Sequence, residues 1–191
     1  MTILRTPDES EVTGLAAELY AEDLESLGYV PTHTRAMALN PEAVRAFESL
    51  IRAVAPRLGM RRYELVTLAA AGAIGSGACR LAHGQKSLKY MPADEVERVA
   101  RDFRTAGLPA DEVAMMEFAE RLSRTSAAMT EQDAATLREH GFDDGEIVDI
   151  ALAAAARNFY SRALHALGVE VDVPPRLSPE LKDALLEGMS A

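Results

Sequence analysis

Apolar positions along this chain recur every three or four residues, which is the spacing of side chains on one face of an α-helix. The clearest helix start is Asn40-Pro41, because asparagine is a favoured N-cap and proline suits the first helical position. Pro31 is expected to interrupt the chain, so residues 29–39 are predicted to form a loop. Helices are expected over residues 7–28, 41–59, 61–74 and 78–90, from positions 92 and 109 onward, and over 130–141, 143–168 and 178–189.

Strand signals are missing from this pattern, since there are no long runs of β-branched or aromatic residues. Alanine is abundant and aromatic residues make up only 5% of the chain, so that helices can approach one another closely. A chain of 191 residues fits one compact domain. We therefore expect residues 1–191 to form a single all-α domain, a helical bundle.

An internal comparison suggests that this bundle contains two related halves. The shift that places Glu64 over Glu146 also places His83 over His165 and Cys79 over Ser161, without a gap. The corresponding half-repeats would be residues 41–90 and 109–168, of which one kept a thiol. The second set, Glu146, Ser161 and His165, is interpreted as structural.

Charge and cysteine content narrow the range of functions. The net charge of −10 disfavours nucleic acids and anionic membrane surfaces as partners. A single cysteine rules out an intrachain disulfide, residues 1–8 show no apolar signal core, and no run approaches the length of a membrane span. A cytoplasmic location is the default expectation.

The candidate chemistry centres on Cys79. His83 follows it by four residues, so on a helix the two side chains share a face and can touch. A thiolate attacks peroxides, and a nearby imidazole can take the thiol proton or stabilise the anion. Gly75 and Gly77 are expected to place Cys79 near a helix start, where the helix dipole lowers the thiol pKa. A tight turn there would bring Glu64 within reach of His83, where a carboxylate fixes one imidazole tautomer.

Together, Glu64, Ser76, Cys79 and His83 resemble the alkylhydroperoxidase D pattern, in which a glutamate precedes Cys-x-x-Cys-x-x-x-His. The resemblance covers residues 28–168 and points to the uncharacterised peroxidase-related branch of the alkylhydroperoxidase D-like, or carboxymuconolactone decarboxylase, superfamily. Its further segments are Gly28-Tyr29-Val30-Pro31, Asn40-Pro41, Phe118-Ala119-Glu120-Arg121-Leu122, Asn158-Phe159-Tyr160-Ser161-Arg162 and Ala166-Leu167-Gly168.

This resemblance implies an antioxidant peroxidase that acts on small hydroperoxides without a cofactor or a metal. By position, Cys79 would be the attacking thiol, and His83 and Glu64 would form the proton relay. Ser76 stands in place of the family's first cysteine and cannot resolve a sulfenic acid into a disulfide. The reductant is therefore expected to be an external thiol or a partner protein. The family also implies a homo-oligomer, a trimer or a hexamer.

Three other interpretations stay open at this stage. A non-redox decarboxylase-like enzyme would need no cysteine pair, and Arg80 and Lys86 could receive the carboxylate of a lactone acid. A catalytically silent, oligomeric binding protein would carry Cys79 as an inert core residue. A zinc site formed by Cys79, His83 and Glu64 has weak support, because no second histidine or cysteine lies nearby at ligand spacing.

Overall fold

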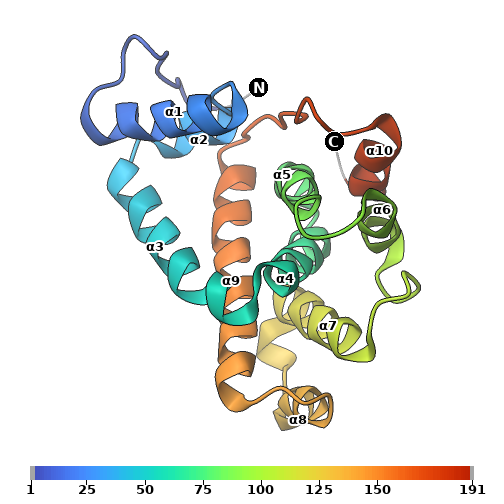
Figure 1. The fold of residues 1–191 in the computed structure, drawn as a ribbon. Helices are drawn as coiled ribbons and strands as arrows, with labels where there is room; N and C mark the ends of the chain where they lie inside the picture. The colour runs from blue at the N-terminus through green and yellow to red at the C-terminus, as the bar shows by residue number, and fades with distance from the viewer. Residues whose placement is uncertain (1–2, 190–191) are drawn as a thin grey trace.

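The computed structural model describes residues 3–189, and every regular element in that range is a helix (Figure 1). The predicted all-α class is thereby confirmed. None of the helices in this range is long and apolar enough to cross a membrane. The elements are α1 (Gly14–Leu27), α2 (Thr32–Met37), α3 (Pro41–Leu58), α4 (Met60–Ala73), α5 (Gly77–Ser87), α6 (Ala93–Asp102), α7 (Ala110–Thr125), the 3-10 helix η1 (Ser126–Ala128), α8 (Glu131–Glu139), α9 (Asp144–Ala166) and α10 (Pro179–Leu186).

Helix α4 forms the centre of the core, where it packs against α5, α7 and α9. All residues from 63 to 71 are buried, and Leu65, Val66 and Ala70 are fully enclosed. Enclosing a valine or leucine side chain contributes about 1.5–3 kcal/mol. The helix that carries Glu64 is therefore fixed by its packing on several sides, as its apolar pattern predicted.

A short turn joins α4 to α5 and sets the position of Cys79. Gly75 has a φ of +71°, a backbone region that favours glycine, and the Ser76 amide donates to the Ala71 carbonyl at 2.9 Å. Helix α5 begins at Gly77, so Cys79 is its third residue. The expectation that Cys79 lies near a helix start is confirmed.

The N-terminal helices form a layer of their own above one end of α3 and α9 (Figure 1, blue). This layer has a separate apolar cluster, to which α3 contributes Val44. The cluster consists of Leu19, Tyr20, Val30, Ala38 and Val44. Because α1 and α2 lie across the ends of α3 and α9, they form one side of the space between these helices.

Two predicted boundaries in this layer are wrong. Residues 32–37, which were expected to belong to a loop, form α2, because Pro31 precedes the helix as its N-cap instead of breaking it. The Thr32 amide and hydroxyl both donate to the carboxylate of Asp172, at 2.6 and 2.9 Å, and so tie the helix start to a distant segment. Helix α1 begins at Gly14 and not near residue 7, since Glu11 closes a turn onto the Asp8 amide at 2.8 Å.

The proposed half-repeats occupy different local structures. Glu64 and His83 lie on two helices that a turn separates, whereas Glu146 and His165 lie at opposite ends of the continuous helix α9. Glu146 belongs to the capping box at the start of α9, where it accepts a hydrogen bond from the Asp143 amide. A second glutamate–histidine pair is therefore not formed, and the repeat stays a prediction.

Candidate active site

The thiol of Cys79 lies against two side chains of α9. The Ser161 hydroxyl donates to Cys79 Sγ at 3.0 Å, and the Arg157 guanidinium donates to the same sulfur at 3.4 Å. All three residues are buried. Ser161 and Arg157 are four residues apart on α9, so they present one face to the sulfur. Within the described structure the sulfur is not hydrogen-bonded to His83, and its polar partners come from α9.

These contacts favour the thiolate. Burial alone would raise the pKa of the Cys79 thiol, because it disfavours the charged form. The positive charge of Arg157, the hydrogen bonds from Ser161 and Arg157, and the nearby Ser76 hydroxyl act in the opposite direction, and the pKa ends below its usual value. Burial also opposes the charge on Arg157, but its interactions with Cys79 and Tyr63 hold the guanidinium pKa above its usual value. The arrangement therefore favours a thiolate–guanidinium pair over a neutral thiol.

Glu64 and His83 form a second buried pair, as the sequence predicted. His83 Nδ1 and Glu64 Oε2 are 2.6 Å apart, and the two side chains come from α4 and α5. The ring of Tyr63 packs edge-on against the imidazole, with the ring centroids 6.3 Å apart. Since Nδ1 is engaged with the carboxyl group, Nε2 is the nitrogen available for proton exchange with a bound molecule.

Burial disfavours the charged forms of both Glu64 and His83. It raises the pKa of Glu64 to about 7, although the positive charges of Lys86, Arg157 and Lys89 counteract part of the effect. Burial, together with the charges of Arg157 and Lys86, lowers the pKa of His83 well below its usual value. The imidazole is therefore neutral near pH 7, and the Glu64 carboxyl group can hold or release a proton there.

Ser76 is fully buried at the start of α5. Its hydroxyl has no hydrogen bond of regular geometry, yet it lies close enough to Cys79 to help lower the thiol pKa. A hydroxyl proton can rotate toward the sulfur, so Ser76 can stabilise the Cys79 thiolate. A cysteine at this position would instead have been able to form a disulfide with an oxidised Cys79.

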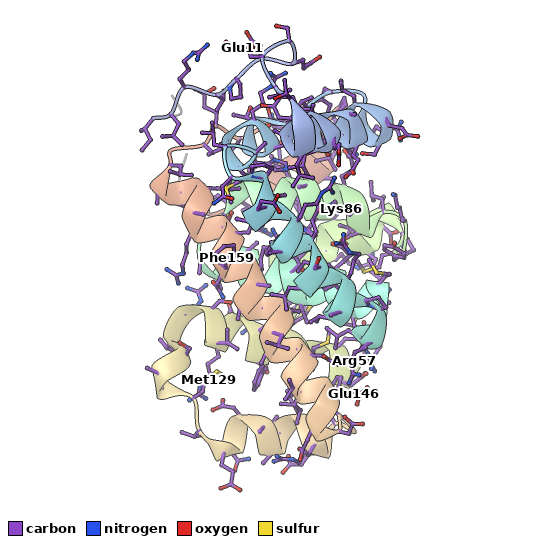
Figure 2. All side chains as sticks on the ribbon, turned by 90° about the vertical axis from the view of Figure 1, so that its left-hand side faces the viewer. Glu11, Arg57, Lys86, Met129, Glu146 and Phe159 are labelled. Atoms are coloured by element: carbon purple, nitrogen blue, oxygen red, sulfur yellow. The ribbon has the colours of Figure 1, made fainter. Side chains whose placement is uncertain are left out.

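Cys79, Arg157, Glu64 and His83 line one cavity of about 430 Å³, which lies between α1, α2, α3, α4, α5 and α9 and opens to solvent. Figure 2 looks onto α3 and α9, which pack side by side along one wall. The apolar part of the lining includes Met37, Val44, Phe47 and Ile51, and Tyr160 packs on Phe47 with ring centroids 4.9 Å apart. A small organic molecule would thus meet the thiol and the imidazole in a largely apolar cavity.

Two assignments made from the sequence need correction. Arg80, expected near the site, donates to the backbone carbonyls of Ala100 and Glu187, so it ties α5 to α6 and to the end of α10. Ser161, interpreted as structural, contacts the thiol directly. In the sequence it aligned with Cys79 in the internal comparison and stood in one of the segments that resemble the family, whereas Arg157 had no signal. Within residues 3–189, no three side chains of metal-ligand type come together.

The buried Glu64 carboxyl group should make the stability of the protein depend on pH. The pKa of this group is 4.5 in the unfolded chain and about 7 in the folded protein, so between these pH values the folded state retains a proton that the unfolded chain releases. The contribution of Glu64 to the free energy of unfolding is thus complete below pH 4.5 and is lost as the pH rises through 7. Relative to Glu64→Gln, which cannot titrate, wild type should lose about 3 kcal/mol over this range. Urea unfolding at a series of pH values measures the difference, and a constant difference would contradict the prediction.

Comparisons with known proteins agree with this architecture. The sequence matches no family model and no curated protein. In structure it is similar to a peroxidase-related protein with an alkylhydroperoxidase D core from Ralstonia eutropha JMP134, with a TM-score of 0.81, 24% identity, and 96% of each chain covered. A peroxidase-related protein from Silicibacter sp. TM1040 gives a TM-score of 0.79 and 26% identity, covering 90% of this chain and 92% of that one.

A third solved structure with this architecture is a debrominase, Bmp8, in a cysteine-to-alanine variant bound to 2,3,4-tribromopyrrole. It has a TM-score of 0.78 and 18% identity, and the match covers 96% of this chain and 98% of that one. One helical arrangement therefore spans almost the whole chain in all three comparisons. The chain therefore has the all-helical fold of the alkylhydroperoxidase D-like, peroxidase-related structures.

Proposed function

We propose that this protein is a thiol-dependent peroxidase, an oxidoreductase that reduces small hydroperoxides through Cys79. The observation that carries the proposal is a thiol with a lowered pKa in the same cavity as a neutral glutamate–histidine pair. A nucleophile with a stabilised anion and a nearby proton donor are the two groups that the cleavage of an O–O bond requires.

In the first step the Cys79 thiolate attacks the distal oxygen of the hydroperoxide. An S–O bond forms as the O–O bond breaks, the sulfur is oxidised by two electrons to a sulfenic acid, and the alkoxide leaves. His83 protonates the alkoxide from Nε2 and regains a proton at Nδ1 from Glu64, which gives the alcohol. Arg157 and Ser161 hold the sulfur in its anionic form before the attack.

Resolution needs a thiol from outside the chain, because Cys79 is the only cysteine. One external thiol attacks the sulfenic acid, releasing water and forming a mixed disulfide. A second thiol attacks this disulfide, leaves as the oxidised dithiol and restores Cys79. A low-molecular-weight thiol or a reductant protein that reaches the cavity could fill this role.

One equivalent of cumene hydroperoxide, added without reductant, should add one oxygen atom to Cys79 and yield one equivalent of alcohol, as detected by mass spectrometry. Added thiol should then remove that oxygen. Ser76→Cys is the matched control: its second thiol lies three residues before Cys79, and we expect it to convert the sulfenic acid to a disulfide without external thiol. An unmodified Cys79 after complete mixing would contradict the proposal.

The same cavity bears on the alternative enzymes. For a decarboxylase-like enzyme that acts on a lactone acid, Lys86 lines the cavity with His83 and could bind the carboxylate. Arg80, the other candidate, lies outside the cavity lining. A dehalogenase like the debrominase would use the same thiol against the aromatic wall formed by Phe47 and Tyr160. A silent binding protein would not need a thiol whose pKa is lowered against the effect of burial. The peroxidase uses more of the observed groups than any of these.

Self-association stays a prediction. An apolar stripe on α9 supports it, since Val148, Leu152 and Phe159 are exposed large side chains at helical spacing. Figure 2 shows Phe159 on the outer side of α9. Burying such a stripe between copies of the chain would remove apolar surface from water.

A further inference from the structure

Lys86 lies on the same face of α5 as the reactive groups. It follows Cys79 by seven residues, which corresponds to nearly two helical turns and an axial rise of about 10 Å. Cys79, Ala82, His83 and Lys86 all line the cavity. Figure 2 shows Lys86 beside α3 and beneath the N-terminal helices. The ammonium group therefore stands at the other end of the cavity face that begins at the thiol.

Among residues 3–189, the Lys86 ammonium has no hydrogen bond or ion pair; the residue is exposed to solvent, and its side chain lines the cavity. Nearby acids attract it from a distance, but each already has a closer partner. Glu22 and Glu48 bind Arg45, Asp23 accepts from Thr34, and Glu64 is paired with His83.

Protein atoms near the ammonium displace part of its hydration, which lowers the pKa of Lys86. An anion bound beside it would compensate for this loss. None of these nearby acids is paired with the ammonium in the described structure, so a bound anionic molecule would supply the counterion that the chain does not.

We propose that the cavity selects hydroperoxides that carry an anionic group, above all a carboxylate, and that Lys86 binds this group while the peroxide meets Cys79. This inference rests on the proposed peroxidase function and adds the substrate class to it. Between the two ends, Val44, Phe47 and Ile51 provide an apolar wall for an aliphatic or aromatic body. The distance along α5 suits a molecule whose peroxide and anion are separated by an aromatic ring or a chain of similar length.

The test compares cumene hydroperoxide with its para-carboxylate, which differs only in the anion. Wild type should have a kcat/KM about tenfold higher for the carboxylate, the effect of one charge-assisted hydrogen bond. Lys86→Met should bring the ratio of the two kcat/KM values close to one, and Lys86→Arg should restore part of it. Lys89→Met is the matched control, because it removes the same charge from an exposed residue outside the cavity lining and should preserve the ratio.

Binding separates this inference from the peroxidase function. Isothermal titration calorimetry with para-isopropylbenzoate, which has no peroxide, should show binding to wild type and loss of binding in Lys86→Met, even if neither hydroperoxide is turned over. The amide analogue should bind both proteins weakly. Equal kcat/KM values for the two hydroperoxides in wild type, or a preference that survives in Lys86→Met, would overturn the inference, and so would equal binding of the acid to both proteins.

Discussion

Replacing Cys79 with alanine is expected to reduce hydroperoxide turnover to the uncatalysed rate in the presence of an external thiol. The chain contains no other cysteine, so no second sulfur can take over the attack. Ser76 and Ser161 approach the same position but carry hydroxyl groups, which cannot be oxidised by a peroxide as a thiolate can. The loss should be at least about 1,000-fold, as is typical when a covalent nucleophile is removed. Coupled consumption of hydroperoxide and thiol measures it.

Cys79→Ser is the matched control for folding. Alanine leaves a small cavity and removes the acceptor for Ser161 and Arg157, which should cost on the order of 1 kcal/mol of stability. Serine keeps an acceptor of similar size, so this variant should unfold close to wild type in urea while it is equally inactive. Turnover in either variant within a few-fold of wild type would rule out the thiol mechanism.

The part of the site that could be predicted from the sequence is the part that local geometry determines. Cys79 and His83 share a helical face at a spacing of four residues. The turn at Gly75 is short, so the register between α4 and α5 is fixed and Glu64 falls opposite His83. The start of α3 was predictable for the same reason, since Asn40 caps its own helix through a contact three residues away.

The rest depends on contacts between distant segments. Arg157 and Ser161 lie 78 and 82 residues beyond Cys79, and only the packing of α9 brings them to the sulfur. The capping of α2 by Asp172 spans 140 residues. Arg80 was expected near the site because it follows Cys79 directly, yet adjacent residues on a helix point in different directions, and its side chain reaches α6 instead.

Arg157 donates to the Cys79 sulfur, a role that the sequence did not indicate. Its replacement is expected to have the second large effect on the reactivity of the thiol. In Arg157→Met the thiolate loses the only guanidinium that donates to it among the described residues, while most of the side-chain volume is kept. A hydrogen bond to a charged group contributes about 1.5–3 kcal/mol, which corresponds to roughly one to two pKa units. The Cys79 pKa should rise by this amount, and the rate of its reaction with peroxide at pH 7 should fall about 10- to 100-fold.

The pH dependence of Cys79 alkylation distinguishes this role from a merely structural one. In wild type the reactive thiolate persists to lower pH, because the charge and hydrogen bonds around it lower its pKa. In Arg157→Met the whole profile should move to higher pH, and Arg157→Lys should move it back part of the way by restoring the charge without the second donor. Arg162→Met is the matched control on the same helix, since Arg162 donates to the Ser123 carbonyl and lies outside the cavity lining. Peroxide turnover that falls while the alkylation profile stays in place would mean that Arg157 acts on the fold of α9 and not on the sulfur.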